Sequence, residues 1–285
     1  VNMSGLRCVF VSDLHGRDDR YRKLKDLVVA ETPDVVLLGG DLLPFERHRP
    51  ATRFIHDVLR PACATIRDQS AQPPPRVLLI LGNDDPRIRE QELIDDEKNN
   101  LWTYLHGRSV KISGTVFSGY SCVPPTPFGL KDWERYDVSR YVDPGCVSPE
   151  EGQRTIPVSA DEVRDRTIHE DLVRMSNGLD MDRSVFLFHS PPYGSLLDRA
   201  ALDGKSVDHA ALDVHVGSVA MFRFIIEQQP LLTLHGHIHE SPRHTGSWRQ
   251  RMGRTHCFSA AHDGPELAVV RFDLEDLDGA TRELI

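Results

Sequence analysis

The sequence predicts an α/β fold, and three observations support this prediction. Short apolar runs rich in β-branched residues alternate with segments whose apolar residues recur at helical spacing, which is typical of strands joined by helices. Several of these runs end in polar side chains, as parallel strands do where they form a site. The chain has 285 residues, of which 39% are hydrophobic and 27% charged, so it can bury a sizeable core.

The first third of the chain alternates strand and helix. The predicted strands are Leu6–Ser12, Val35–Leu38 and Arg76–Leu81. The predicted helices are Arg17–Glu31, which ends before a Pro-Asp pair, and Ala51–Asp68, in which Pro61 is expected to kink or restart the helix.

The remainder of the chain contains a long interruption. Residues 121–157 are irregular and rich in proline and glycine, and they are predicted to form an insert in a single domain that spans residues 1–285. One or two strands are expected before the insert, within Val110–Tyr120. The elements predicted after it are the helices Ala160–Asn177 and Val214–Gln229 and the strands Ser184–His189, Leu231–His235, Thr255–Ala260 and Glu266–Leu274.

Composition excludes several classes of protein. The formal net charge of −9 disfavours a protein that binds along duplex or other extended nucleic acid, which needs a basic face. No apolar run is long enough for a transmembrane helix, and Val1–Gly5 does not resemble the start of a signal peptide. The five cysteines form no Cys-x-x-Cys pair and indicate reduced thiols. These features predict a cytoplasmic protein with no membrane partner.

The candidate functional residues lie at the ends of separate predicted strands. They offer oxygen and nitrogen donors that suit Mn²⁺, Fe or Zn²⁺ better than a thiolate zinc site would. Their number exceeds the need of one ion and suits two ions that share a bridging carboxylate. The set comprises Asp13, His15, Asp41, Asn83, His189, His237 and His239.

The single motifs differ in specificity. The Gly-His-x-His sequence at residues 236–239 is expected by chance only about 0.05 times in a chain with this glycine and histidine content. Taken alone, Asp13 could cap a helix, Asp41 could start a turn, and His189 could be a packed histidine at a strand end. Their order along the chain, one motif per strand end, favours the metal site.

The motifs resemble those of the calcineurin-like metallophosphoesterase family. That family's order is Asp-x-His, Gly-Asp, Gly-Asn-His-Asp/Glu, a lone His and Gly-His-x-His, and the match here extends from residue 13 to residue 239. The resemblance implies a four-layer α/β/β/α sandwich of two mixed sheets flanked by helices. It also implies two divalent cations, Mn²⁺ first, with Fe, Zn²⁺, Ni²⁺ and Co²⁺ as alternatives. One cation would be held by Asp13, His15, Asp41 and His239, and the other by Asp41, Asn83, His189 and His237.

The same resemblance implies catalytic roles for Asn83, Asp84 and Asp85 in a phosphoesterase whose metal-bridging hydroxide attacks phosphorus. Asp84 replaces the histidine usual at that position. Beside two cations its pKa should fall, so Asp84 should be ionised and a poor proton donor. Metal-bound water, His215 or His262 could then supply the proton. A negative Asp84 opposes a monoester dianion more than a diester monoanion, which predicts a phosphodiesterase. Asp85 is expected to orient a neighbouring group.

The expected partner is a small phosphoester, either a nucleotide or another small phosphodiester, and the sequence leaves the oligomeric state open. The alternatives are a phosphomonoesterase or protein phosphatase, a nuclease, and a non-catalytic scaffold on the same fold. Within the insert, Trp133, Arg135 and Tyr136 could select the substrate by stacking and charge. The other interpretation of the insert is a loop that packs on itself.

Overall fold

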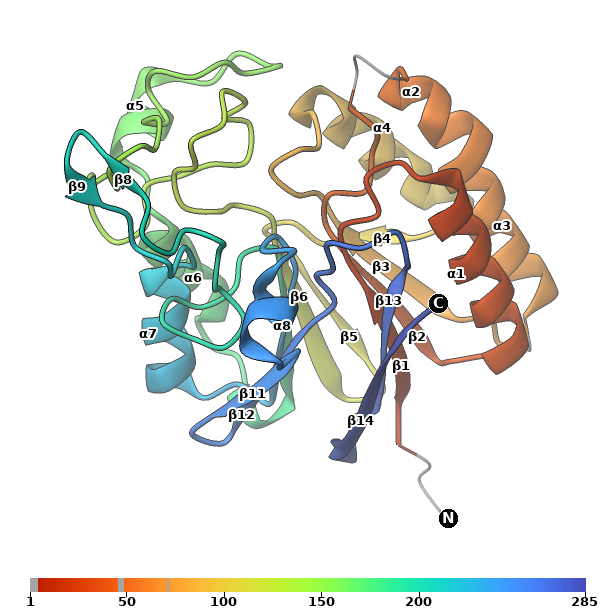
Figure 1. Cartoon of the computed structure of the whole chain (residues 1–285). Helices are drawn as coiled ribbons and strands as arrows, with labels where there is room; N and C mark the ends of the chain where they lie inside the picture. The colour runs from red at the N-terminus through yellow and green to blue at the C-terminus, as the bar shows by residue number, and fades with distance from the viewer. Residues whose placement is uncertain (1–4, 46–48, 71) are drawn as a thin grey trace.

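The computed structural model describes residues 5–45, 49–70 and 72–285. Residues 1–4, on which the prediction about a signal peptide partly rests, lie outside this part of the chain. Two six-stranded mixed sheets stand face to face at the centre, and helices cover their outer sides (Figure 1). The predicted four-layer α/β/β/α sandwich is confirmed.

The first sheet has the strand order β14-β13-β1-β2-β3-β4. Strands β1 to β4 run parallel, whereas β13 and β14 are antiparallel to their neighbours. The strands are β1 Arg7–Val11, β2 Val35–Gly39, β3 Arg76–Ile80, β4 Thr103–Tyr104, β13 Ala268–Asp273 and β14 Asp276–Leu284. The helices on its outer side are α1 Asp18–Glu31, α2 Ala51–Phe54, α3 Arg60–Gln69 and α4 Glu90–Asp95 (Figure 1).

The second sheet has the order β11-β12-β10-β7-β6-β5, with β6, β7, β10 and β12 parallel. Its strands are β5 Ser109–Ile112, β6 Thr115–Tyr120, β7 Ser184–Phe188, β10 Leu232–His235, β11 Arg249–Met252 and β12 Thr255–Ser259. Its outer side is covered by α6 Ile168–Ser176 and α7 Val219–Gln228 (Figure 1). The remaining α-helices and strands are α5 Ala160–Asp165, α8 Ser241–Thr245 and the hairpin of β8 Ser206–Val207 with β9 Ala210–Ala211.

Strand alternation divides the core into layers. In β1, Cys8 and Phe10 belong to the cluster between the two sheets, whereas Val9 and Val11 pack against the helices. Because successive side chains of a strand point to opposite faces, strands that are apolar at every position indicate a sheet covered on both faces. The continuous apolar runs of the sequence therefore belong to the centre of each sheet.

Several predicted boundaries were wrong. The predicted helix Ala160–Asn177 is two helices, because Thr167 caps α6: its hydroxyl accepts a hydrogen bond from the Glu170 N–H, and the Glu170 carboxylate accepts one from the Thr167 N–H. The helix predicted from Val214 begins five residues later, after the N-cap Ser218. The predicted helix Ala51–Asp68 is continuous, but residues 55–59 form a π-helical turn ahead of Pro61.

None of the described helices combines the length with the apolar composition needed to cross a membrane.

Candidate metal centre

The strand ends bring the candidate ligands together from both sheets. In the first sheet, Asp13 and His15 follow β1, Asp41 follows β2 and Asn83 follows β3. In the second sheet, His189 follows β7, and His237 and His239 follow β10. Because each set of strands is parallel, their carboxyl ends meet at one end of the sandwich.

One group of donor atoms comprises Asp13, His15, Asp41 and His239, all within 4.8 Å of one another. The Nε2 atoms of His15 and His239 are 3.1 Å apart. His239 Nε2 is also 3.3 Å from Asp13 Oδ1, and His15 Nε2 is 3.9 Å from Asp41 Oδ2. This is the set that the family resemblance assigns to one cation.

A second group comprises Asp41, His189 and His237, again within 4.8 Å. His189 Nε2 lies 3.3 Å from Asp41 Oδ2 and 3.1 Å from Asn83 Oδ1, so Asn83 adjoins this group. Asp41 belongs to both groups, as a bridging carboxylate would.

The donors fit divalent cations. Asp13 Oδ2 and His15 Nδ1 are buried and have no hydrogen-bond partner among the described residues. Unpaired buried polar atoms cost free energy, and imidazole nitrogens that converge with carboxylate oxygens are a typical donor set for Mn²⁺, Fe or Zn²⁺. Two cations bound here would coordinate side chains from both sheets at once.

The backbone of the ligand loops is strained. Asp13, His15, Asp41 and His237 have positive φ angles of 58°, 48°, 52° and 72°, a conformation that costs a non-glycine residue about 1–3 kcal/mol and is concentrated at functional sites. Gly82 is required for close approach: a Cβ there would lie 2.3 Å from Asp41 Oδ1 and 2.6 Å from His189 Nε2.

In the protein without cations, the negative charges of the carboxylates and the positive charges of the protonated imidazoles stabilise one another. Burial favours the neutral form of Asp41, but His189 prevails and lowers the pKa of Asp41 to about 2. Burial likewise opposes protonation of His189 and His239, yet Asp41 raises the pKa of His189 to about 10 and Asp13 raises that of His239 to about 9. Burial lowers the pKa of His237 to about 3.

Asp84 lies at the open side of the centre. Its N–H donates to Asp41 Oδ1 at 2.9 Å, and its carboxylate accepts from Asn83 Nδ2 at 3.1 Å. Burial and the Asp41 carboxylate raise the pKa of Asp84 to about 7. The predicted ionised state of Asp84 therefore depends on bound cations, which would lower this pKa.

Asp85 is buried and organises the neighbouring loops. Its carboxylate accepts backbone N–H bonds from Gly82 at 2.9 Å, Leu42 at 3.0 Å and Leu43 at 2.7 Å. These donors flank Asp41 and Asn83, so Asp85 connects the loop after β2 to the loop after β3. Asp85 is fully buried, and its contacts are those of a residue that orients others.

Sequence reasoning missed Arg20, which is buried in α1. Its Nη2 donates to Gly264 O at 2.7 Å, and its Nη1 donates to Asp13 O at 2.5 Å. Arg20 thus fixes the first ligand loop against the loop between β12 and β13. An arginine within a predicted amphipathic helix gives no signal of such a role.

The side chains of the insert that were named for substrate selection are not accessible to a substrate. Trp133 and Tyr136 are 1% and 3% exposed, and Arg135 forms ion pairs with Glu162 and Asp171. The interpretation as a substrate-selecting surface is therefore wrong for these residues, and the packed loop is the form observed. The two histidines named as proton donors are also paired, as His215 with Asp198 at 2.8 Å and His262 with Glu266 at 2.9 Å.

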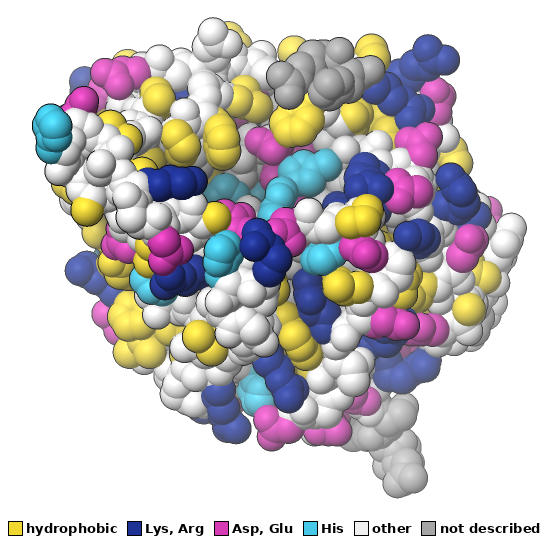
Figure 2. All heavy atoms as spheres, viewed as in Figure 1, with side chains coloured by type: hydrophobic (Ala, Val, Ile, Leu, Met, Phe, Trp, Pro, Cys, Tyr) yellow, Lys and Arg dark blue, Asp and Glu magenta, His cyan; other side chains and the backbone are white. Residues whose placement is uncertain are grey.

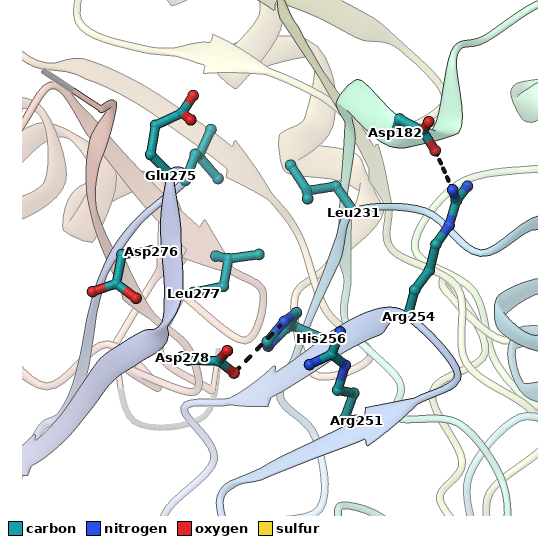
Figure 3. Close-up of a pocket in the computed structure, with 10 residues that line it drawn as sticks. Asp182, Leu231, Arg251, Arg254, His256, Glu275, Asp276, Leu277 and Asp278 are labelled. Carbon is teal, nitrogen blue, oxygen red and sulfur yellow. Dashed lines mark ion pairs between the residues drawn. The ribbon is translucent and has the colours of Figure 1, made fainter. Parts of the chain in front are cut away.

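The surface is hollowed where the ligand loops meet. Figure 2 shows histidine and acidic side chains gathered in the middle of this face. A separate cavity of about 370 Å³ lies near the opposite strand ends, between the start of β12 and the β13–β14 turn, and holds the ion pairs of Arg254 with Asp182 and of His256 with Asp278 (Figure 3). The candidate metal groups do not involve that cavity.

Comparison with known proteins identifies the family. Residues 6–241 match the family described as calcineurin-like phosphoesterase, and the chain belongs to it. The crystal structure of TT1561 from Thermus thermophilus has 15% sequence identity and a TM-score of 0.57, over 99% of each chain. A dimetal phosphatase from Danio rerio has 13% identity and a TM-score of 0.56, over 99% of this chain and 96% of that one. These likenesses show a shared fold. No curated protein matches the sequence.

Proposed function

We propose that the protein is a phosphodiesterase that hydrolyses a nucleotide or another small phosphodiester with two divalent cations, preferably Mn²⁺, in the cytoplasm. Family membership supports phosphoester hydrolysis, and the paired donor groups that share Asp41 support two cations. The position of Asp84 at the centre supports the preference for diesters. This last observation is the one on which the substrate class depends.

Charge explains the preference for diesters. With two dications bound, Asp13, Asp41 and Asp84 leave only about one unit of positive charge in the centre when the histidines are neutral. A histidine at position 84 would leave about two units or more. Lowering the positive charge of the centre weakens its attraction for a dianionic monoester more than its attraction for a monoanionic diester. The negative charge of Asp84 also repels the second charge of the monoester directly.

The chain's own groups divide the work of hydrolysis. When bound, the cations supply a nucleophile at neutral pH and neutralise charge on the phosphoryl oxygens. Asn83, whose side-chain amide donates to Asp84, can donate to a nonbridging phosphoryl oxygen if it turns from that carboxylate. Asp41 belongs to both donor groups and would fix the separation of two cations bound to them. The four histidines must be neutral to act as ligands.

The proposal is tested with bis-p-nitrophenyl phosphate and p-nitrophenyl phosphate, each assayed with Mn²⁺ and after chelation. We expect Mn²⁺-dependent hydrolysis that favours the diester. Faster hydrolysis of the monoester would retain the metal centre but contradict the diester preference. Absence of hydrolysis with every cation tried would contradict the enzymatic proposal and favour a scaffold.

A phosphomonoesterase is the second candidate, and one observation favours it. Burial and the Asp41 carboxylate raise the pKa of Asp84, which favours its protonated form against the opposite effect of bound cations. A protonated Asp84 would not repel a dianion, and it could donate its proton to the leaving group. The dimetal phosphatase among the structural neighbours shares the fold. The paired assay above separates the two candidates.

A further inference from the structure

The insert is attached to the metal-ligand loop through one side chain. Trp133 Nε1 donates a hydrogen bond to the backbone carbonyl of Asp85 at 2.8 Å. The Asp85 carboxylate in turn accepts from the two backbone N–H groups that follow Asp41 and from the one that precedes Asn83. Two sets of buried hydrogen bonds, joined by Asp85 itself, therefore connect the insert to the backbone beside the ligands.

The insert also contacts the segment that follows Asp85. The Arg87 N–H donates to Asp132 Oδ2 at 2.8 Å, and the Arg87 guanidinium lies over the Trp133 ring, 5.3 Å from its centroid. The Ile88 N–H donates to Thr155 Oγ1 at 3.0 Å, and the Thr155 N–H donates to Asp132 Oδ1 at 2.8 Å. Two separate parts of the insert, Asp132–Trp133 and Thr155, thus hold the backbone at Arg87 and Ile88.

The insert is itself rigid where it makes these contacts. Lys131 and Glu134 form a fully buried ion pair, and Glu134 also accepts from the Thr126 N–H at 2.7 Å. The His106 ring meets the Trp133 ring edge to face, with centroids 4.8 Å apart. A rigid support of this kind can fix a loop, whereas a loose one could not.

We infer that Trp133 is a positioning residue of the metal centre, through which the insert holds Asp41 and Asn83 in the geometry that binds cations. The inference rests on the proposed metal centre. Substitution of a residue that orients metal ligands without touching the metal typically lowers metal affinity by about 10–100-fold. Loss of the indole N–H leaves the buried Asp85 carbonyl unpaired, which releases the loop.

The chain offers a matched control. Trp102 is also buried, and its Nε1 donates to the backbone carbonyl of Leu93 at 2.9 Å, outside the ligand loops. Trp102→Phe and Trp133→Phe therefore remove the same type of hydrogen bond from two tryptophans. Comparing them separates an effect on the metal centre from a general loss of stability.

The experiment measures Mn²⁺ stoichiometry and affinity by calorimetric titration of the metal-stripped full chain, with urea unfolding of each variant. We expect the wild type to bind two Mn²⁺ ions, Trp133→Phe to bind at least one of them about tenfold more weakly, and Trp102→Phe to retain wild-type affinity. Unchanged affinity in Trp133→Phe, or equal losses in both variants, would overturn the positioning role.

A milder variant guards against failure of Trp133→Phe to fold. Thr155→Val removes the hydroxyl that accepts from the Ile88 N–H and donates to Asp132 Oδ2 but leaves the tryptophan in place, and it should weaken Mn²⁺ binding severalfold. Wild-type affinity in this variant would count against the role of the insert. A wild-type protein that binds no Mn²⁺ would instead overturn the metal centre itself, and the inference with it.

Discussion

At the scale of single residues, the centre depends on which side chains share a cation and which set its charge. Asp41 belongs to both donor groups, and Asp84 lies beside them, where the family resemblance leads us to expect a histidine. The first residue should determine whether the centre forms, and the second which substrate it prefers. Their substitutions should therefore have different consequences.

Asp41→Asn should abolish Mn²⁺-dependent hydrolysis, because a neutral amide is a poor bridge between two cations. We expect a loss of more than about 100-fold, beyond that of substitutions outside the ligand set. The measurement is the rate with bis-p-nitrophenyl phosphate under saturating Mn²⁺. Asp26→Asn, at an exposed position of helix α1, is the control and should be unaffected. Full activity in Asp41→Asn would refute the bridging role.

Asp84→His should shift the ratio of diester to monoester hydrolysis toward the monoester by about tenfold, which corresponds to about 1.4 kcal/mol. The reason is the change from a negative side chain to a neutral or positive one. The two nitrophenyl substrates measure the ratio. Asp84→Asn removes only the charge and should shift the ratio part of the way. An unchanged ratio in both variants would remove the charge argument.

Mn²⁺ affinity should rise with pH. In the metal-free protein the pKa of His189 is raised to about 10 and that of His239 to about 9, so at neutral pH both hold protons that a cation must displace. Affinity should therefore increase from pH 6.5 to pH 8.5, with protons released on binding. Titrations in buffers of different ionisation enthalpy measure that release. Binding that is independent of pH would contradict these protonation states.

At the scale of elements, the insert is held by a buried ion pair between Lys131 and Glu134. Breaking a buried pair by removing one partner costs about 3–5 kcal/mol, whereas replacing both by apolar residues is often neutral. Lys131→Met should therefore lower the free energy of unfolding by about this amount, and Lys131→Met with Glu134→Leu should restore most of it. Urea unfolding measures both. Equal stability of the single variant and the wild type would show that the pair contributes little.

The sequence predicted the strands that bear the ligands because each combines a short apolar run with a polar end. Those strands are buried on both faces, so their hydrophobicity is continuous and easily seen. The short strand β4 and the edge strand β14 were not predicted. β4 has only two residues, and β14 is largely polar because one edge of the sheet faces water. The break before Thr167 was missed because the capping box lay within an otherwise periodic segment.

The arrangement of the site was predictable only in part. Motif spacing placed the candidate ligands at strand ends, and the structure brings all of them to one region. Arg20 and Trp133 contact segments that are distant in the sequence and adjacent in the fold. No local sequence pattern predicts such contacts. For the same reason the aromatic insert was open to two interpretations, and burial of Trp133 decides between them.

At the scale of the whole molecule, each donor group draws on both sheets. Asp13, His15, Asp41 and Asn83 come from the first sheet, and the other ligands come from the second. Cations bound here would therefore join the two halves of the sandwich. In addition to its role in chemistry, the centre should stabilise the fold.

Chelation should lower the melting temperature of the protein. A ligand present at about 1,000 times its dissociation constant stabilises the native state by about 4 kcal/mol. Thermal unfolding with Mn²⁺ and with a chelator measures the difference, and the variant Asp41→Asn should lose most of it. An identical melting temperature under both conditions would indicate that no cation links the sheets.

The left-handed backbone at Asp13, His15, Asp41 and His237 has an evolutionary consequence. These positions would be less strained with glycine, and those of the histidines also with asparagine. Selection for stability alone would therefore replace these four residues. Only a requirement for metal binding and hydrolysis would keep them. Descendants of this chain that abandoned hydrolysis should accumulate glycine at these four positions, or asparagine at the two histidine positions, before their buried strands change.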